Sequence, residues 1–362
     1  MELHKTMRFT IHSYYFCLLC FLCWTSPNGV FSQATLVQPP NAAPSQGRVE
    51  RLNYFPSAFV TARNVDVWLP SDYNPEKKYG VIYMHDGQNL FDGNSTWNQQ
   101  EWGIDESVAA YNSGIPSTKK NQTDSSNSDL SPKTEYIVVG IWNDGVNRHS
   151  NYFPQKVYES LTAKEKAAIM EAKRQNQSDV FHNPINSDDY LKFIVYELRP
   201  LINKTYSTHT DPAHTVIGGS SMGGLISMYG ICEYPGVFGT AACFSTHWPG
   251  IFEMKNNPIP DAMVRYFKNK IPDPIDHKFL FTHGTEGLDA LYGPTQKRID
   301  QIMAKSGYEI LINTENFFFS NWKTQVDKGL GHEESTWQKQ FRENMQFLLV
   351  DYQYHRYPAC DE

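Results

Sequence analysis

Short runs of β-branched and aromatic residues alternate with stretches of helical periodicity from about residue 49 onwards. The runs predict strands at residues 65–69, 80–85, 136–142, 214–218, 241–245, 278–282 and 308–313. Apolar residues at helical spacing predict helices at residues 161–174, 190–201, 225–232, 295–305 and 334–352. Interleaved strands and helices indicate the α/β class, with a mainly parallel central sheet covered by helices on both faces.

The first 32 residues have a different pattern. His4, Lys5 and Arg8 precede an apolar run at residues 14–24, which Ser, Pro, Asn and Gly then break. This order is typical of a cleavable signal peptide. The run of about eleven residues is shorter than the roughly 20 that a membrane span needs, so we expect a secreted or periplasmic protein without an integral membrane span. We expect no lipid anchor, because the small residues that lipid attachment requires do not precede the cysteines of this run.

Composition limits the remaining possibilities. Residues 33–48 are rich in Pro, Ala, Gln and Asn and lack periodicity, which predicts a mobile leader to one catalytic domain at residues 49–362. The formal net charge of −7 supplies no broad basic surface, so nucleic acid is not an expected partner. The cysteine and histidine spacings do not resemble a zinc site, and we predict no metal ion.

The strongest local signal is a G-x-S-x-G motif formed by Gly219, Ser221 and Gly223, with a β-branched run before it and a helical run after it. This is the context of a nucleophile elbow, in which a sharp turn from strand to helix projects a serine hydroxyl. Ser221 is therefore the predicted nucleophile, and Ser220 is out of register with the motif. The backbone N–H of Met222, at the start of the helix, is a predicted oxyanion-hole donor.

A serine nucleophile needs a base, and in a nucleophile-elbow fold the acid and then the histidine follow the serine in the chain. His332 lies in a glycine-bracketed loop before an amphipathic helix, whereas His355 lies in a tail after it, so His332 is the predicted base. The acid is expected after the strand at residues 278–282, where both Glu286 and Asp289 qualify. Chain order alone does not separate these two carboxylates.

The second oxyanion donor is expected in the loop after the strand at residues 80–85. Gly87 or Gln88 is the predicted donor, because glycine lets the backbone approach a substrate closely. Asp86 is expected to shape this turn by bonding to the backbone. Aromatic residues could stack on a sugar or an aromatic acid, and the predicted substrate contacts are Trp142, Trp248 and His247.

Taken together, these stretches resemble the putative esterase family, the esterase D-like branch of the α/β-hydrolases, which includes enterochelin, feruloyl and acetylxylan esterases and S-formylglutathione hydrolases. The resemblance covers most of the chain after the leader. It implies a triad of Ser221, Asp289 and His332, with Asp289 favoured over Glu286 because Leu-Asp-x-x-Tyr recurs in related sequences, and it implies no cofactor. The matching stretches are residues 65–70, 81–92, 140–143 with Arg148, 152–154, 219–225, 245–248, 288–292 and 331–337.

The expected activity is hydrolysis of a carboxylic ester through an acyl-enzyme on Ser221. The expected substrate is a small-molecule or polysaccharide ester of the carbohydrate-acyl, feruloyl, acetyl or siderophore type. The signal peptide disfavours a cytosolic role such as formylglutathione hydrolysis. Two alternatives stay open at this point: an acyltransferase on the same scaffold, and a non-catalytic carbohydrate-binding protein. The second is supported by the number of tryptophans, which include Trp97 and Trp102.

Overall fold

The computed structural model describes residues 36–37, 43–96, 98–114, 134–308, 310–312 and 318–349. The chain divides into two units, Met1–Gln33 and Ala34–Glu362, and all described residues belong to the second. No helix among them combines the length and the apolar character that crossing a membrane requires.

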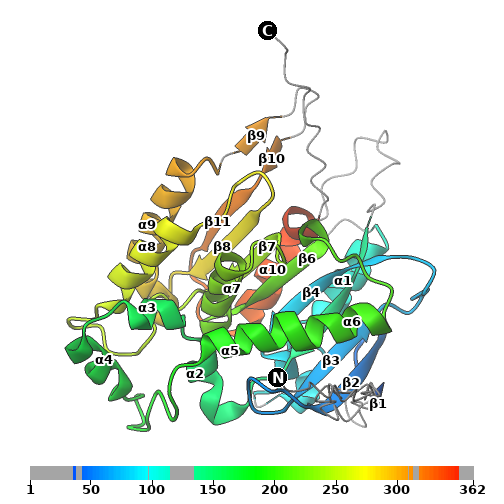
Figure 1. Ribbon diagram of the computed structural model, residues 1–362. Coiled ribbons are helices and arrows are strands. Elements are labelled where there is room, and N and C mark those ends of the chain that lie inside the picture. Colours follow the sequence, from blue (N-terminus) through cyan, green and yellow to red (C-terminus); the bar gives the residue numbers. More distant parts are fainter. Residues whose placement is uncertain are drawn as a thin grey trace, which may run out of the picture. The chain divides into compact units, whose positions relative to one another are not determined.

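A nine-stranded sheet organises the described part of the chain, with the strand order β1-β2-β3-β5-β4-β6-β7-β8-β11 (Figure 1). The strands from β5 to β11 in this order are parallel, whereas β1, β2 and β3 form an antiparallel edge. The strands of this sheet are β1 (Leu36–Val37), β2 (Arg48–Phe55), β3 (Arg63–Leu69), β4 (Tyr79–His85), β5 (Glu135–Ile141), β6 (Thr215–Ser220), β7 (Thr240–Phe244), β8 (Lys278–Gly284) and β11 (Trp322–Asp327).

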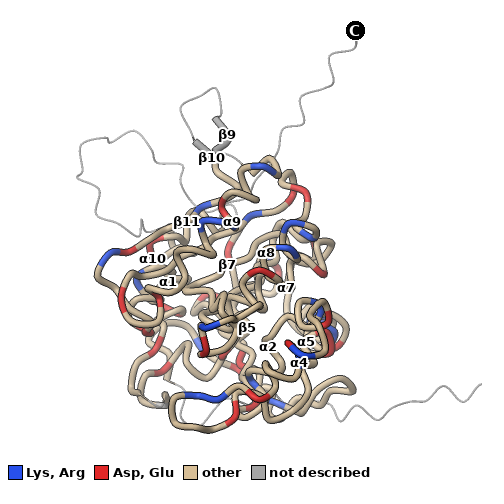
Figure 2. The backbone as a smooth tube through the Cα atoms, turned by 90° about the vertical axis from the view of Figure 1, so that its left-hand side faces the viewer, with Lys and Arg blue, Asp and Glu red and all other residues tan. Residues whose placement is uncertain are grey.

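Helices cover both faces of the sheet, which explains why β4, β6, β7 and β8 are buried along their whole length. On one face α1 and α10 lie side by side (Figure 2) and pack on an apolar cluster that includes Trp102 and Phe341. The opposite cluster includes residues of α5, α7, α8 and α9. The helices are α1 (Ile104–Asn112), α2 (Arg148–Tyr152), α3 (Gln155–Glu159), α4 (Ala163–Met170), α5 (Ser187–Lys192), α6 (Arg199–Thr205), α7 (Met222–Glu233), α8 (Ile259–Lys270), α9 (Gly293–Lys305) and α10 (Glu334–Leu349).

The predicted fold class is confirmed, and most predicted elements have a counterpart within a few residues. One prediction is wrong in its placement: the strand predicted at 308–313 is β9 (Ile310–Ile312), which pairs with β10 (Phe318–Ser320) in a separate two-stranded sheet. The strand that extends the central sheet beyond β8 is β11 instead. Its sequence Trp-Lys-Thr-Gln-Val-Asp is mostly polar and only half-buried, as an edge strand can be, so it carries no run of apolar residues that would predict it.

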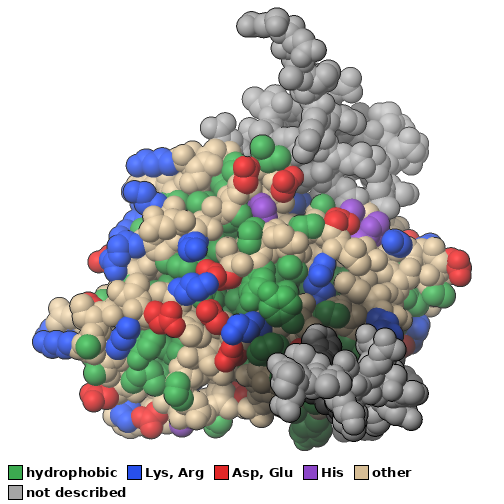
Figure 3. Space-filling view, viewed as in Figure 1, with side chains coloured by type: hydrophobic (Ala, Val, Ile, Leu, Met, Phe, Trp, Pro, Cys, Tyr) green, Lys and Arg blue, Asp and Glu red, His purple; other side chains and the backbone are tan. Residues whose placement is uncertain are grey.

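Charges of both signs are interspersed over the face shown in Figure 3, where Lys and Arg side chains lie among Asp and Glu. No field of one sign therefore covers the described residues of this face. Cys232 and Cys243 are both buried and free, whereas Cys360 lies outside the described residues.

Candidate active site

Ser221 occupies the turn between β6 and α7, with backbone angles φ 57° and ψ −118°. Such angles are strained for a residue with a side chain, and they persist because the surroundings hold them. The Ser221 N–H donates to the Phe244 carbonyl at 2.8 Å. A Cβ on Gly219 would lie 3.1 Å from both the Gly223 backbone and the His85 Cβ, so any larger residue there would push these neighbours apart. The sequence motif thus folds as a nucleophile elbow.

His332 lies in the loop between β11 and α10, and its Nδ1 is hydrogen-bonded to Asp289 Oδ1 at 2.6 Å. The donor is the imidazole N–H, because the carboxylate oxygen can only accept. Glu286 is the other candidate for the acid. It is exposed and precedes the 3-10 turn Gly287–Leu291, which contains Asp289. The structure therefore brings Asp289, and not Glu286, to the imidazole.

Asp289 is fully buried and its carboxylate is held by three hydrogen bonds. Oδ1 accepts from His332, while Oδ2 accepts from the Ser245 hydroxyl and the Gly284 backbone N–H, both at 2.6 Å. Burial opposes ionisation, but these hydrogen bonds outweigh it and hold the pKa of Asp289 below its ordinary value. The Ser245 hydroxyl in turn accepts from Trp337 Nε1 at 2.9 Å, which fixes its direction. Asp289 is thus an anion that orients the His332 ring.

Ser221 and His332 line the same cavity, which has a volume of about 580 Å³. Polar side chains dominate its walls, and two tryptophans supply flat apolar surface. The other lining residues are Asp86, Gln88, Asn89, Thr96, Trp142, Asn143, Arg148, Ser220, Glu334 and Trp337.

The predicted oxyanion donors come from both sides of the elbow. Met222 is the first residue of α7, where backbone N–H groups lack an acceptor within the helix. Gly87 and Gln88 belong to a 3-10 turn directly after β4, and Gln88 lines the cavity. The Gln88 side-chain oxygen also accepts from the Asn143 N–H at 3.3 Å. Gln88 therefore lines the cavity that Ser221 lines, and Met222 follows Ser221 at the start of α7.

Asp86 precedes this turn in the left-handed backbone region, at φ 57°. The sequence predicts that its side chain bonds to the backbone of the turn, and this prediction is wrong. The Asp86 carboxylate instead accepts two hydrogen bonds from Arg148, each 2.7 Å long, and one from Asn143 Nδ2 at 2.7 Å. Burial opposes ionisation of this carboxyl, but Arg148 outweighs it and holds the pKa of Asp86 below its ordinary value. A bidentate ion pair is well suited to fix the direction in which the turn leaves β4.

Gly87 packs directly against β5, and this contact yields a prediction. A Cβ there would lie 2.4 Å from the Gly140 carbonyl carbon and 2.8 Å from the Ile141 nitrogen, so the backbone must shift. We expect Gly87→Ala to lower the free energy of unfolding by about 1–3 kcal/mol and to lower ester turnover at least about tenfold, because a displaced donor stabilises the oxyanion less. Gly236→Ala is the matched control, since a Cβ at Gly236 has open space. Wild-type turnover in Gly87→Ala would exclude this turn from the oxyanion hole.

Tyr292 connects the candidate triad to a buried histidine. Its hydroxyl lies 2.9 Å from His247 Nδ1 and 3.5 Å from His332 Nδ1. The nearby Ser221 side chain lowers the pKa of Tyr292, against the larger effect of burial. Burial raises the pKa of Tyr292 and lowers the pKa of His247 well below its ordinary value, so both are neutral near pH 7. His247, predicted as a substrate contact, is instead a buried partner of Tyr292 and does not line the cavity.

The two predicted tryptophan contacts differ in their placement. Trp142 lines the cavity, and its Nε1 donates to Asp66 at 2.8 Å. Trp248 does not: it is fully buried, donates to Gln296 Oε1 at 3.1 Å and belongs to the apolar core. This difference has a simple cause, because most large aromatic residues of a globular domain fill its core. Trp97 lies outside the described residues.

The sequence analysis gives no role to four residues around the site: Ser245, Trp337, Tyr292 and Arg148. Each acts through a contact with a residue far away in the chain, such as the bond from Trp337 to Ser245, so periodicity cannot reveal them. A signal did exist, because all four lie in the stretches that resemble the esterase family.

The sheet and the elbow define an α/β-hydrolase. The chain belongs to the family described as Putative esterase, whose model matches residues 57–121 and 125–361. It is 24% identical over 198 residues to the uncharacterized protein YjcH of Bacillus subtilis (strain 168); the match spans 54% of this chain and 61%, less than two thirds, of that relative.

Solved structures share the fold at low identity. A mutant of the feruloyl esterase module from Clostridium thermocellum, complexed with sinapinate, superimposes with a TM-score of 0.52 at 15% identity, covering 90% of this chain and 97% of that chain. An IroE-like serine hydrolase from Shewanella oneidensis gives a TM-score of 0.53 at 16% identity, covering 82% and 79%. At such identities the likeness establishes the fold alone.

Proposed function

We propose that this protein hydrolyses a carboxylic ester through an acyl-enzyme on Ser221, with His332 as the general base and Asp289 as the acid that orients it. The observation that carries the proposal is the 2.6 Å hydrogen bond between His332 and buried Asp289 at a cavity that Ser221 shares. Membership of the esterase family supports it.

The proposed reaction has two halves. His332 Nε2 takes the proton of the Ser221 hydroxyl as the oxygen attacks the ester carbonyl, and Asp289 stabilises the imidazolium that forms. The negative charge on the carbonyl oxygen is stabilised by the N–H groups of Met222 and of Gly87 or Gln88. His332 then gives its proton to the leaving alcohol. In the second half, a water molecule activated by His332 releases the acid and regenerates the Ser221 hydroxyl.

The residues that line the cavity favour a substrate with hydrogen-bonding groups. Charged and amide side chains, including Arg148, Asn143 and Glu334, surround the space next to Ser221, and Trp142 offers a face for stacking. A long aliphatic acyl chain would remove water from these polar groups and offer them no hydrogen bond in return. We therefore propose an ester of a hydroxylated alcohol or a hydroxyaromatic acid, the latter being the class that includes the sinapinate bound by the feruloyl esterase module.

The direct test is covalent labelling combined with a substrate panel. A serine-directed phosphonate should label Ser221 and spare Ser220, as read by mass spectrometry of the labelled peptide. Methyl ferulate, acetylated xylan and a catecholate ester should be cleaved faster than a long-chain acyl ester. Label on Ser220 would move the nucleophile, and transfer of the acyl group to an added alcohol in preference to water would reassign the protein as an acyltransferase.

Tyr292 is proposed as a positioning residue for the nucleophile, and Tyr292→Phe tests this. The variant loses the hydroxyl that lies beside Ser221 and His332, so we expect kcat to fall about tenfold with little change in KM. This corresponds to about 1.4 kcal/mol less stabilisation of the transition state. The rate of phosphonate labelling should fall in parallel. The matched control is Tyr190→Phe, which breaks a similar buried bond, from Tyr190 to His85 Nδ1 at 2.8 Å. Equal losses in the two variants would reduce Tyr292 to a role in stability.

A further inference from the structure

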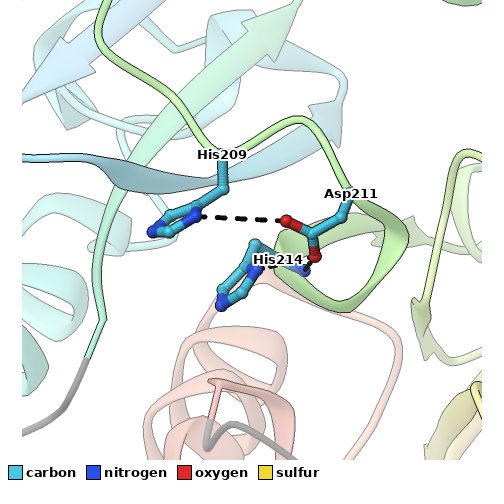
Figure 4. A group of neighbouring side chains, drawn as sticks. All are labelled: His209, Asp211 and His214. Atoms are coloured by element: carbon cyan, nitrogen blue, oxygen red, sulfur yellow. Dashed lines mark hydrogen bonds and ion pairs between the residues drawn. The ribbon is translucent and has the colours of Figure 1, made fainter.

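Three side chains with metal-binding atoms converge just before β6, at the opposite end of that strand from Ser221. They are His209, Asp211 and His214, and one ligand atom of each lies within 4.8 Å of the other two (Figure 4). Both histidines are half-buried and the aspartate is exposed. A group of this composition, two imidazoles and one carboxylate, is a ligand set that divalent transition metals accept.

Both histidines turn a ring nitrogen toward the Asp211 carboxylate. His214 Nδ1 lies 2.7 Å from Asp211 Oδ1, and His209 Nδ1 lies 4.0 Å from Asp211 Oδ2. The two imidazole rings are stacked, with centroids 4.0 Å apart and an angle of 18° between their planes. Figure 4 shows the consequence: the stacked rings both turn their Nδ1 atoms toward the same carboxylate.

The backbone that carries these ligands is fixed. The His209 N–H donates to the Tyr79 carbonyl at 2.8 Å, which ties it to the first residue of β4. Asp211 begins the 3-10 turn Pro212–His214, and its Oδ1 accepts from the His214 N–H at 3.3 Å. The Thr215 hydroxyl donates to the Asp211 carbonyl at 2.9 Å. The ligands are therefore arranged in advance, and binding would order few additional residues.

We propose that His209, Asp211 and His214 bind one divalent transition metal ion, with Zn²⁺ as the reference ion and water completing its coordination. Two ligands that each lie about 2.0–2.2 Å from zinc cannot be more than about 4.4 Å apart. The separations of His209 and His214 from Asp211, 4.0 Å and 2.7 Å, meet this limit. The three ligand atoms together lie within 4.8 Å of one another, so the histidine side chains have to rotate when the ion binds. Binding releases to solvent the proton that His214 Nδ1 shares with Asp211, because a nitrogen that binds a metal carries no proton.

This ion has a structural role. The six residues of β6 separate the cluster from Ser221 by roughly 20 Å at about 3.3 Å per residue, too far for a part in ester chemistry. Thr208, beside the cluster, forms a parallel bridge with Tyr79. The ion therefore stabilises the conformation of the segment at residues 209–214, which backbone bonds hold at the start of β4, and it raises stability without changing turnover.

The test compares the chelator-treated wild-type chain with Asp211→Asn and His209→Gln. Asp211→Asn keeps an oxygen that can cap the turn, and His209→Gln serves should the first variant fold poorly. After equilibrium dialysis against micromolar ZnCl₂, elemental analysis should find one equivalent of Zn²⁺ more in the wild type than in either variant. Zn²⁺ should also raise the melting temperature of the wild type and leave that of the variants unchanged. His182→Gln, at an exposed histidine outside the cluster, should behave as the wild type does.

Each outcome decides the proposal. Co²⁺ in place of Zn²⁺ should give visible absorption bands in the wild type that both variants lack, because these bands report nitrogen and oxygen ligation. Equal zinc content in wild type and variants would overturn the proposal, as would a melting temperature that does not respond to Zn²⁺. A parallel loss of ester turnover in the variants would contradict the structural role.

Discussion

Replacing Ser221 with alanine is expected to lower the rate of ester hydrolysis by about four to six orders of magnitude, which is the scale of losing a covalent nucleophile. The fold should remain intact, because the Cβ, the strained backbone angles and the N–H bond to Phe244 are all retained. Steady-state turnover of a chromogenic ester and a thermal melt measure the two quantities separately.

Ser220→Ala is the matched control for this experiment. Ser220 is the neighbouring residue, it is buried at 5% exposure and it lines the same cavity, but it belongs to β6 rather than to the turn. We expect Ser220→Ala to stay within about tenfold of wild type, because it removes no reacting group. A fully active Ser221→Ala protein would end the proposed mechanism, and a large loss in Ser220→Ala alone would transfer the nucleophile to that residue.

The candidate nucleophile could be predicted from the sequence because the requirements of a nucleophile elbow are local. Gly219, Ser221 and Gly223 must follow a strand and precede a helix, and the residues that create the tight turn are all within a few positions of one another. His332 followed from chain order and from its place in a loop before α10. Local pattern and chain order therefore sufficed for two of the three triad candidates.

The third candidate depends on geometry that spacing does not encode. Glu286 and Asp289 stand three residues apart, and Gly287 between them takes φ +57°, so the chain turns and only Asp289 faces the interior. Its partners Ser245 and Gly284 come from the ends of β7 and β8, which only the folded sheet brings together. The resemblance to the esterase family favoured Asp289 where periodicity could not.

The aromatic contacts and the group of His209, Asp211 and His214 also depend on the fold and could not be predicted from local sequence. Trp142 and Trp248 are both predicted substrate contacts, yet Trp142 lines the cavity and Trp248 is buried in the core. The cluster near β6 contains no cysteine and has no zinc-finger spacing, so it was not predicted. It becomes visible only because the turn at Asp211 stacks His209 on His214.

Replacing Asp289 with asparagine is expected to lower kcat by about four orders of magnitude, the scale observed when the orienting acid of a catalytic triad becomes an amide. Asparagine preserves the shape and can accept from Ser245 and Gly284, but it loses the charge that stabilises the His332 imidazolium. Glu286→Gln is the control, because Glu286 is exposed and should leave kcat close to wild type.

A double substitution separates the orienting role from a general loss of structure. Residues that act as one unit are not additive, so Asp289→Asn added to His332→Ala should cost little beyond His332→Ala alone, whereas independent contributions would multiply. Thermal melts of all variants exclude unfolding as the cause. If Glu286→Gln carries the large loss and Asp289→Asn does not, Glu286 is the acid. If neither substitution matters, Ser221 and His332 operate as a dyad, and the 2.6 Å bond to Asp289 serves the fold instead of the reaction.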